Sequence, residues 1–170
     1  MDTMLYDDDI VTWSEHQAAA LRALSAKPEL SNAVDWANVI EEIESLGRSQ
    51  ISAVERKLTL VLVHLLKKLS APDAPPVHFW RSEITTFQTA ARKGYTRSMR
   101  QRIDWDDLWS TARRQAAADL VAYGDALVSG LPEALPLGPE ELVARDFDVD
   151  IALERLARSL AEAPSSRQIS

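Results

Sequence analysis

Apolar side chains recur at intervals of three and four residues along most of this 170-residue chain. The longest stripe begins after Asp35 and runs to Leu69, and a single glycine, Gly47, lies within it. This spacing is typical of an amphipathic α-helix, because it places the apolar side chains on one face. It predicts one helix over residues 35–69, about 50 Å long at about 1.5 Å per residue. Gly47 indicates either a kink or a point where another helix approaches closely.

Shorter apolar stripes on both sides of this segment predict further helices. We expect one from Asp8 or Asp9 to Pro28, one over residues 77–92 that stops at Gly94, and one that Asp104 caps. Residues 97–127 fit either one helix or two. A short helix over 140–145 and a last one over 150–161 complete the set. No segment of useful length has the period of a β-strand. The predicted fold is therefore all-α, a bundle of about five or six helices around the long central helix.

Length and composition bound the class of protein. The chain suits one globular domain with its own core, so we predict a single helical domain over residues 1–163 and a frayed tail over 164–170. The chain has no cysteine, which excludes disulfides, thiolate metal sites and cysteine nucleophiles. No apolar run reaches the roughly 18 residues that span a membrane. The acidic residues 7–9 stand where a signal peptide needs positive charge, and we expect a soluble cytoplasmic protein that does not bind membranes.

Charge is distributed unevenly along the chain. Residues 1–45 hold 10 acidic and 2 basic side chains, residues 46–118 hold 6 and 13, and residues 119–170 hold 10 and 4. Either the acidic ends pack on the basic middle, or the middle binds an anionic partner. The candidate anion surface consists of Arg92, Lys93, Arg97, Arg100 and Arg102. The net charge of −7 favours internal pairing and disfavours nucleic acid as the partner.

Four short blocks of the sequence are distinctive: Tyr6-Asp7-Asp8-Asp9 with Trp13, Asp35-Trp36 with Glu41-Glu42-Ile43-Glu44-Ser45-Leu46-Gly47-Arg48-Ser49, His64-Leu65-Leu66-Lys67, and Trp80-Arg81. Together these blocks resemble one bacterial family, known as domain of unknown function twenty-nine. Their order and spacing match over roughly residues 5 to 150. The resemblance implies an all-helical fold of this size and implies no activity. The chain departs from the family where Lys68 and Leu69 replace a usual aromatic residue, and its segment beyond Asp150 looks specific to this protein.

Glu41, Glu44 and Arg48 are the most notable polar residues of the long helix. Their spacings of three and four residues place them on one face, and Glu44 and Arg48 have the favourable order for an ion pair. A carboxylate pair of this kind occurs in di-iron bundles, but those also need Glu-x-x-His motifs, and the chain has none. We therefore predict a partly buried polar cluster that contacts another helix, with no metal and no cofactor.

His64 is the remaining candidate, and it lies among apolar neighbours. A histidine in such a segment is more often a core residue than a ligand, although burial also tunes an imidazole as a general base or metal ligand. It lies 20 residues beyond Glu44, about 30 Å along an unbroken helix. The sequence contains no phosphate-binding glycine loop, serine-hydrolase elbow or zinc-protease motif, and catalytic residues stay unassigned.

These observations lead to one preferred function and two alternatives. The preferred hypothesis is a non-enzymatic interaction or regulatory module that acts through a helix-bundle surface, with a protein partner that the sequence does not identify. The alternatives are an enzyme that uses Glu41, Glu44 and His64 for metal-dependent or acid/base chemistry, and a nucleic-acid-associated regulator that uses residues 92–102. We also predict a homodimer, because residues 54–69 are apolar around much of the helix and shorter neighbours would leave part of that surface bare.

Overall fold

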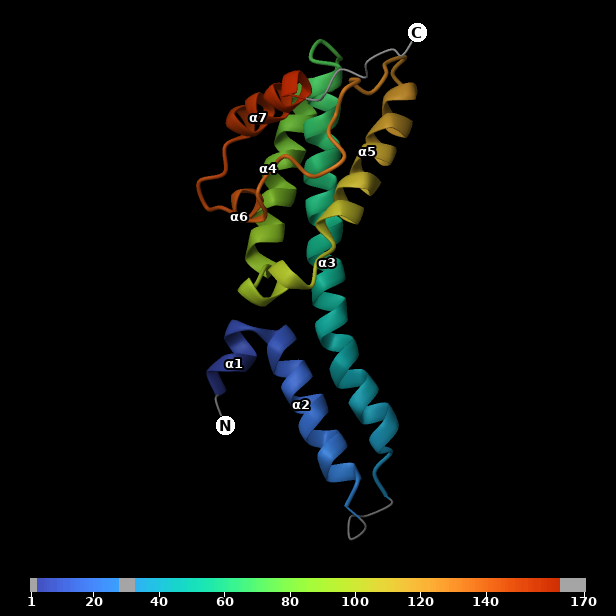
Figure 1. Cartoon of the computed structure of the whole chain (residues 1–170), viewed down its shortest axis with the longest axis vertical. Coiled ribbons are helices and arrows are strands. Elements are labelled where there is room, and N and C mark those ends of the chain that lie inside the picture. The colour runs from blue at the N-terminus through green and yellow to red at the C-terminus, as the bar shows by residue number, and fades with distance from the viewer. Residues whose placement is uncertain (1–2, 28–32, 163–170) are drawn as a thin grey trace. The chain divides into compact units, whose positions relative to one another are not determined.

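The computed structural model describes residues 3–27 and 33–162, and every regular element within these ranges is a helix (Figure 1). The elements are α1 (Thr3–Asp8), α2 (Ile10–Ser25), α3 (Trp36–Ser70), α4 (Val77–Gly94), the 3-10 helix η1 (Arg97–Gln101), α5 (Trp105–Val121), α6 (Pro139–Leu142) and α7 (Val149–Glu162). The prediction of an all-α fold around one long helix is confirmed. Helix α1 was not predicted. The expected helix end at Pro28 and the expected tail over 164–170 lie outside the described residues.

The chain divides into two compact units. The first consists of residues 1–54 and 94–103, and the second consists of residues 55–93 and 104–170. Helix α3 contributes residues 36–54 to the first unit and residues 55–70 to the second. The expectation of a single domain over residues 1–163 stays a prediction.

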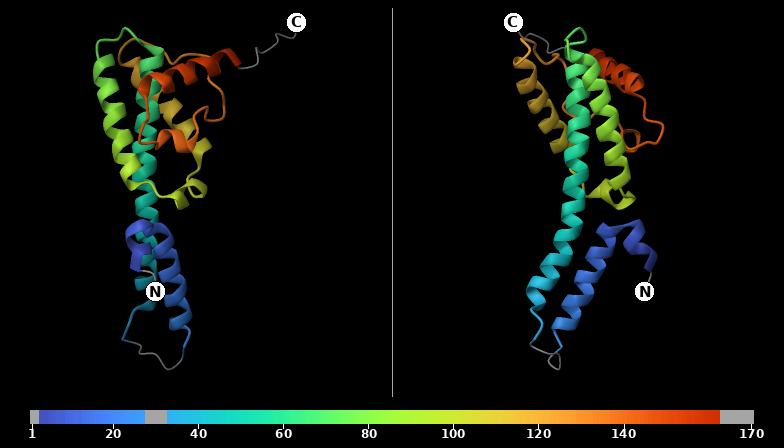
Figure 2. Two further views of the ribbon diagram at one scale, coloured as in Figure 1. Left: turned by 90° about the vertical axis from the view of Figure 1, so that its left-hand side faces the viewer. Right: turned by 180° about the vertical axis from the view of Figure 1, so that it is seen from behind.

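In the first unit, α2 packs along the first half of α3 (Figures 1 and 2). Asp9 starts α2, since its carboxylate accepts a hydrogen bond from the backbone N–H of Thr12 at 3.1 Å. Gly47 of α3 is buried against Ser14 of α2, and a Cβ at position 47 would overlap the Ser14 hydroxyl oxygen. Gly47 therefore marks the close approach of a second helix, one of the two expectations for this residue.

In the second unit, α4 and α5 lie along the second half of α3 (Figure 2). The apolar side chains of this half are almost completely buried within one chain: Leu58, Val61, Leu62, Val63, Leu65 and Leu66. The bare apolar surface on which the homodimer prediction rested is therefore absent from these residues, because the chain's own helices cover them. The homodimer itself stays a prediction.

The structure also decides the organisation of residues 97–127. They form the 3-10 helix η1 and then α5, which ends at Val121. Asp104 caps α5 as predicted, and its carboxylate accepts from the N–H of Asp107 at 3.0 Å. None of the helices within the described ranges combines the length and the apolarity that crossing a membrane requires.

Buried polar contacts fix the segments that follow α5. The side-chain amide of Gln88 on α4 donates to the carbonyl oxygens of Leu142 at 3.1 Å and Ala144 at 2.8 Å. The indole N–H of Trp109 donates to the carbonyl oxygen of Pro132 at 2.9 Å. Helix α6 is one turn that ends at Leu142, whereas the sequence predicted a helix over 140–145. The Gln88 amide takes the Leu142 and Ala144 carbonyls, which a continuing helix would use for its own hydrogen bonds.

We predict that the effect of Gly47→Ala depends on Ser14. In the wild-type background the added Cβ collides with the Ser14 hydroxyl, and we expect a loss of roughly 1–3 kcal/mol of stability from overpacking. In a Ser14→Ala background the collision is absent, and the higher helix propensity of alanine is expected to stabilise the protein by up to about 1 kcal/mol. Urea denaturation of the four proteins measures this coupling.

Gly138 supplies the control, because a Cβ there would meet no atom within 4 Å. Gly138→Ala is expected to give the same small change whether residue 14 is serine or alanine. Equal effects of Gly47→Ala in both backgrounds would contradict the close-packing role assigned to Gly47.

Candidate functional sites in the two units

The three polar candidates on the first half of α3 form ion pairs in the structure. The guanidinium of Arg48 donates to the carboxylate of Glu41 at 2.5 Å, on the exposed side of α3. Glu44 instead accepts from Arg22 of α2 at 2.6 Å. Glu44 thus contacts a second helix, whereas Glu41 and Arg48 pair with each other two turns apart on the same helix.

A small pocket lies between α2 and α3 beside these ion pairs. It has a volume of about 160 Å³ and is lined by Val11, Ser14, Glu15, Glu44, Gly47, Arg48 and Ile51. Its three charged lining residues all have partners, because Glu15 pairs with Arg102, Glu44 with Arg22, and Arg48 with Glu41. The pocket therefore presents balanced charge rather than a set of free carboxylates.

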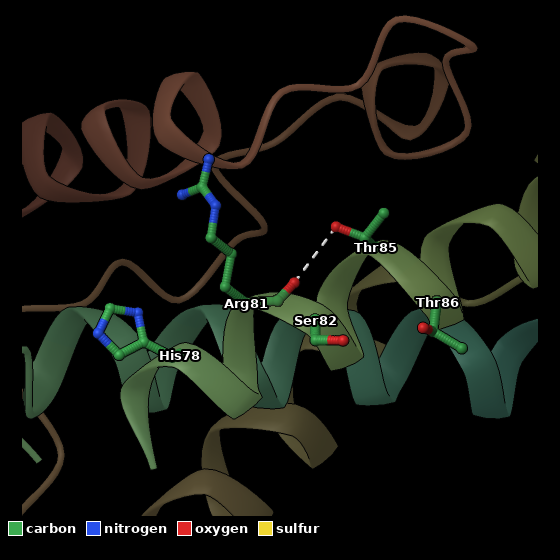
Figure 3. A pocket seen from close by; sticks show the side chains of 5 residues that line it. All are labelled: His78, Arg81, Ser82, Thr85 and Thr86. Carbon is green, nitrogen blue, oxygen red and sulfur yellow. Dashed lines mark hydrogen bonds between the residues drawn. The ribbon is translucent and has the colours of Figure 1, made fainter. Parts of the chain in front are cut away.

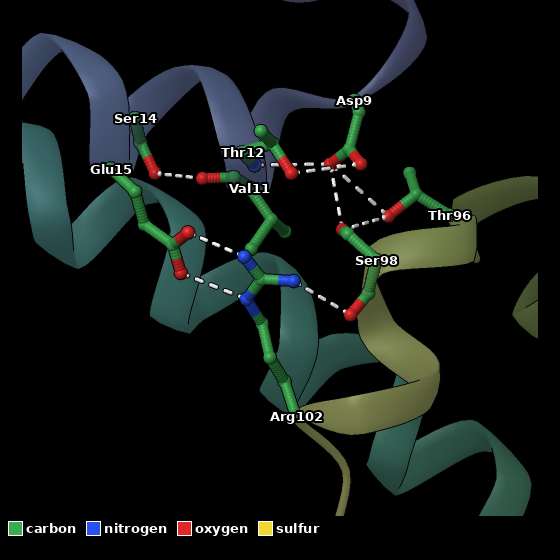
Figure 4. A network of polar contacts seen from close by, with 8 residues as sticks. All are labelled: Asp9, Val11, Thr12, Ser14, Glu15, Thr96, Ser98 and Arg102. Atoms are coloured by element: carbon green, nitrogen blue, oxygen red, sulfur yellow. Dashed lines mark hydrogen bonds and ion pairs between the residues drawn. The ribbon is translucent and has the colours of Figure 1, made fainter.

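A polar network in the first unit joins the start of α2 to η1 (Figure 4). The carboxylate of Asp9 accepts hydrogen bonds from the hydroxyls of Thr12 at 3.1 Å, Ser98 at 2.9 Å and Thr96 at 3.3 Å. Partial burial acts to raise the pKa of Asp9, but the bonds from Thr12, Ser98 and Thr96 outweigh it and hold the pKa below its ordinary value. Asp9 therefore caps α2 and also holds the segment that follows α4.

Arg102 forms the second half of this network. Its guanidinium makes a two-point contact with Glu15 of α2, with Nε at 2.8 Å from Oε1, and it also donates to the carbonyl oxygen of Ser98 at 2.7 Å. The hydrogen bond from Arg102 lowers the pKa of Glu15. A glutamate of the acidic N-terminal segment thus pairs with an arginine of the basic middle of the chain.

His64 lies in the second unit, where its side chain is 9% exposed. Its ring stacks on that of Phe87 with centroids 5.9 Å apart, and Nδ1 is 2.7 Å from the carbonyl oxygen of Leu60. A carbonyl oxygen only accepts, so Nδ1 must carry a proton and donate it, which leaves Nε2 unprotonated in the neutral ring. Burial lowers the pKa of His64, and the nearby Lys67 acts in the same direction.

Lys67, one turn beyond His64, is 6% exposed and lies beside two aromatic rings and a carboxylate. Its Nζ lies 5.1 Å from the ring centroid of Trp80 and 5.7 Å from that of Tyr123. It also forms an ion pair with Asp119 of α5 at 3.2 Å. The aromatic rings and the carboxylate together compensate for the burial of the ammonium group.

An open groove of about 410 Å³ runs along α4 and is lined by His78, Arg81, Ser82, Thr85 and Thr86 (Figure 3). Arg81 points away towards α7, where it donates to both carboxylate oxygens of Asp150 at 2.6 and 2.8 Å. The hydroxyl of Thr85 donates to the carbonyl oxygen of Arg81 at 3.2 Å. The groove thus offers mainly hydroxyls and one imidazole.

Across residues 3–27 and 33–162, no three histidine, aspartate or glutamate side chains gather in an arrangement that could hold a metal ion. The candidates Glu41 and Glu44 belong to the first unit and His64 belongs to the second. The basic candidates are divided in the same way, since Arg97, Arg100 and Arg102 lie in the first unit, whereas Arg92 and Lys93 lie in the second. Arg102 forms an ion pair with Glu15.

Comparison with known proteins gives a consistent result. The family model described as domain of unknown function DUF29 matches residues 5–148. The chain belongs to this family. A crystal structure of an alpha-helical protein of unknown function from Rhodospirillum rubrum ATCC 11170 is similar to it at 33% identity, with a TM-score of 0.82, and the match covers 89% of this chain and 96% of that one. No curated protein matches the chain.

The blocks that carry the resemblance to the DUF29 family lie at contacts between helices. Gly47 faces Ser14, and Asp9 caps α2 and binds Ser98. Lys67 of the His64 block meets Trp80 of the last block. The contacts of Lys67 could not be predicted from the sequence. Trp80, Asp119 and Tyr123 are 13 or more residues away, and no local spacing brings them together.

We predict that His64 makes stability depend on pH. Because the folded protein holds the pKa of His64 below its ordinary value of about 6.5, the unfolded chain binds the proton more readily, and stability falls as the pH drops through this range. His64→Gln removes the effect. Unfolding free energies of both proteins, measured by urea denaturation between about pH 7.5 and about pH 5.5, are expected to converge as the pH falls.

The comparison isolates His64 from the other groups around it, which are Lys67, Glu83 and Asp119, because these are present in both proteins. His78→Gln, at an exposed position of α4, serves as the matched control. A difference between wild type and His64→Gln that stays constant over the whole pH range would show that His64 is not held neutral by burial.

Proposed function

We propose that this protein is a non-enzymatic interaction module, and that its binding face lies on the α2–α3 pair of the first unit. The observation that carries the proposal is a set of apolar side chains left uncovered on this pair. Val39 and Leu46 of α3 are 40% and 36% exposed, and Leu24 of α2 is 41% exposed. Membership of the DUF29 family implies no activity, so the proposal rests on this surface.

The two residues on α3 belong to one face of the helix. They lie seven residues apart, which is two helical turns, so their side chains project in nearly the same direction. Glu42 lies between them, three residues after Val39 and four before Leu46, and it is exposed. This face therefore combines two apolar contacts with a central carboxylate, a pattern suited to a partner helix with an apolar stripe and a basic residue.

The polar candidates for catalysis support the same conclusion. Glu41 and Glu44 accept hydrogen bonds from Arg48 and Arg22, and Glu15 at the pocket between α2 and α3 is held by Arg102. A catalytic carboxylate must be able to exchange a proton or meet a substrate, whereas each of these carboxylates is bound by a guanidinium group.

A second copy of the chain is one partner that would fit this face. Two copies of α3 laid side by side would cover Val39 and Leu46 symmetrically, as in an isologous dimer. This gives the homodimer a different basis from the buried second half of α3. The absence of cysteine and the bacterial family resemblance support a module of the bacterial cytoplasm.

Site-specific photocrosslinking in the cells that make the protein tests the proposal. A crosslinkable residue at position 39 or 46 is expected to give a discrete product, because both positions face the partner. The same residue at Ala19, an exposed position of α2, should give none. Leu46→Glu should abolish the product formed from position 39 by placing a charge in an apolar contact, whereas Ala19→Glu should leave it intact.

The mass of the product identifies the occupant. A product of two chains assigns the face to a homodimer, and any other discrete mass assigns it to a different protein. If positions 39 and 46 give no more product than position 19, this face is not a binding surface and the proposed function is wrong.

A further inference from the structure

An open groove with an apolar floor lies where the chain turns from α6 into α7 (Figure 1). It has a volume of about 250 Å³ and belongs entirely to the second unit. Its apolar lining consists of Ala144, Phe147 and Ile151. Ile151 is 56% exposed, whereas Ala152 and Leu156 of the same helix are buried. Helix α7 therefore packs one face into the core and leaves Ile151 outside the core, at the groove.

Hydrogen bonds fix the segments that form this groove. Gln88 of α4 binds two backbone carbonyl oxygens at the end of α6. Glu141 of α6 accepts from Arg155 of α7 at 2.8 Å, which ties the two helices together. Asp148 starts α7, because its carboxylate accepts from the backbone N–H of Ile151 at 3.1 Å. A groove whose walls are already held in place binds a ligand without the cost of ordering them.

The polar lining of the groove is negatively charged. Its ionisable residues are Glu141, Asp146, Asp148 and Arg155, so three carboxylates and one guanidinium give a formal charge of −2. Glu141 and Arg155 form an ion pair and neutralise each other. The N–H group that binds Asp148 is uncharged and leaves the charge of that carboxylate in place. The exposed carboxylates of Asp146 and Asp148 therefore set the charge beside the apolar lining.

We propose that the groove between α6 and α7 binds a short basic segment of a partner protein. One aliphatic side chain of the segment packs on Phe147 and Ile151. A lysine or arginine next to that side chain pairs with Asp146 or Asp148, since charge complementarity selects the partner. The volume suits a single side chain, because pockets for whole drug-sized ligands have about 300–1,000 Å³. The proposal concerns the second unit and does not rest on the apolar face of the α2–α3 pair.

The lining of the groove disfavours other classes of ligand. The two carboxylates repel the phosphate groups of nucleic acids and of anionic lipids. A small organic cation would satisfy the carboxylates but leave Phe147 and Ile151 uncovered. A basic peptide segment with an aliphatic residue meets both requirements at once.

The test is a titration of the full-length ¹⁵N-labelled protein with short peptides, followed by NMR. The probe is a capped pentapeptide with a central leucine between two pairs of lysines. One comparison peptide has serine in place of leucine, and the other has glutamate in place of every lysine. We expect shift changes concentrated in residues 141–155. The leucine–lysine peptide should bind about tenfold more tightly than the serine peptide, because it buries one more aliphatic side chain, and its binding should weaken as salt rises.

Two variants separate the apolar contact from the charged one. Ile151→Ser should weaken the leucine–lysine peptide by about tenfold and leave the serine peptide unchanged. Asp146→Asn should weaken both lysine peptides by up to about fivefold. Val121→Ser on α5 and Glu154→Gln on α7 are the matched controls, because both residues are exposed and neither lines the groove. Both controls should leave binding unchanged. Circular dichroism of each variant checks the fold.

Four outcomes would overturn the proposal. Equal affinity for the leucine and serine peptides would show that the groove binds cations in general. Equal weakening by the controls would show binding elsewhere on the protein. No binding of the leucine–lysine peptide at low salt would remove the proposed ligand. If light scattering finds a dimer that Ile151→Ser dissociates, a second copy of the chain occupies the groove instead.

Discussion

A helix of 35 residues is stable in water chiefly because other side chains pack on it, since its own hydrogen bonds contribute little net stability. Helix α3 meets this constraint in two different ways along its length. Its first half is covered by α2 at a contact between small residues, Ser14 and Gly47. Its second half is covered by α4 and α5 with large aliphatic and aromatic side chains. Two kinds of packing on one helix account for the two compact units.

Ion pairs between distant segments set the alignment of these helices more than they add stability. Arg22 with Glu44, Arg102 with Glu15, and Arg81 with Asp150 all involve at least one exposed partner, and such pairs contribute about 0–1 kcal/mol each. Their geometric effect is larger, because each pair is formed only when the two elements pack in one register. Two carboxylates of the acidic N-terminal segment, those of Asp9 and Glu15, thus bind the segment that follows α4.

The elements that local chemistry specifies could be predicted from the sequence. Asp9 and Asp104 each cap the helix that follows, Gly94 ends α4, and the apolar period gives the extent of α3. The 3-10 helix η1 could not be predicted. Its backbone hydrogen bonds lie within Thr96–Arg102, but its position depends on a contact with Asp9, nearly 90 residues earlier in the chain.

The contacts of the candidate polar residues on α3 could be predicted only in part. Spacing places Glu41, Glu44 and Arg48 near one another on α3, yet the partner of Glu44 is Arg22 of another helix. Which of several cations a carboxylate meets is decided by the angle and register at which two helices cross. That information is spread over all the side chains in the contact, and no short block of sequence contains it.

Lys67 illustrates why polar residues persist in an otherwise apolar half of α3. An aliphatic side chain at this position would avoid the desolvation cost of a buried ammonium group, and replacing buried ion pairs with apolar residues is often neutral or stabilising. The ammonium group, however, accepts few arrangements: it needs the carboxylate of Asp119 and the faces of Trp80 and Tyr123 at the same time. Contacts between leucines have no directional requirement, whereas a slip of α4 or α5 along α3 would leave this charge buried and unpaired. Lys67 therefore acts as a register device for the second unit, as the contact of Ser14 with Gly47 does for the first.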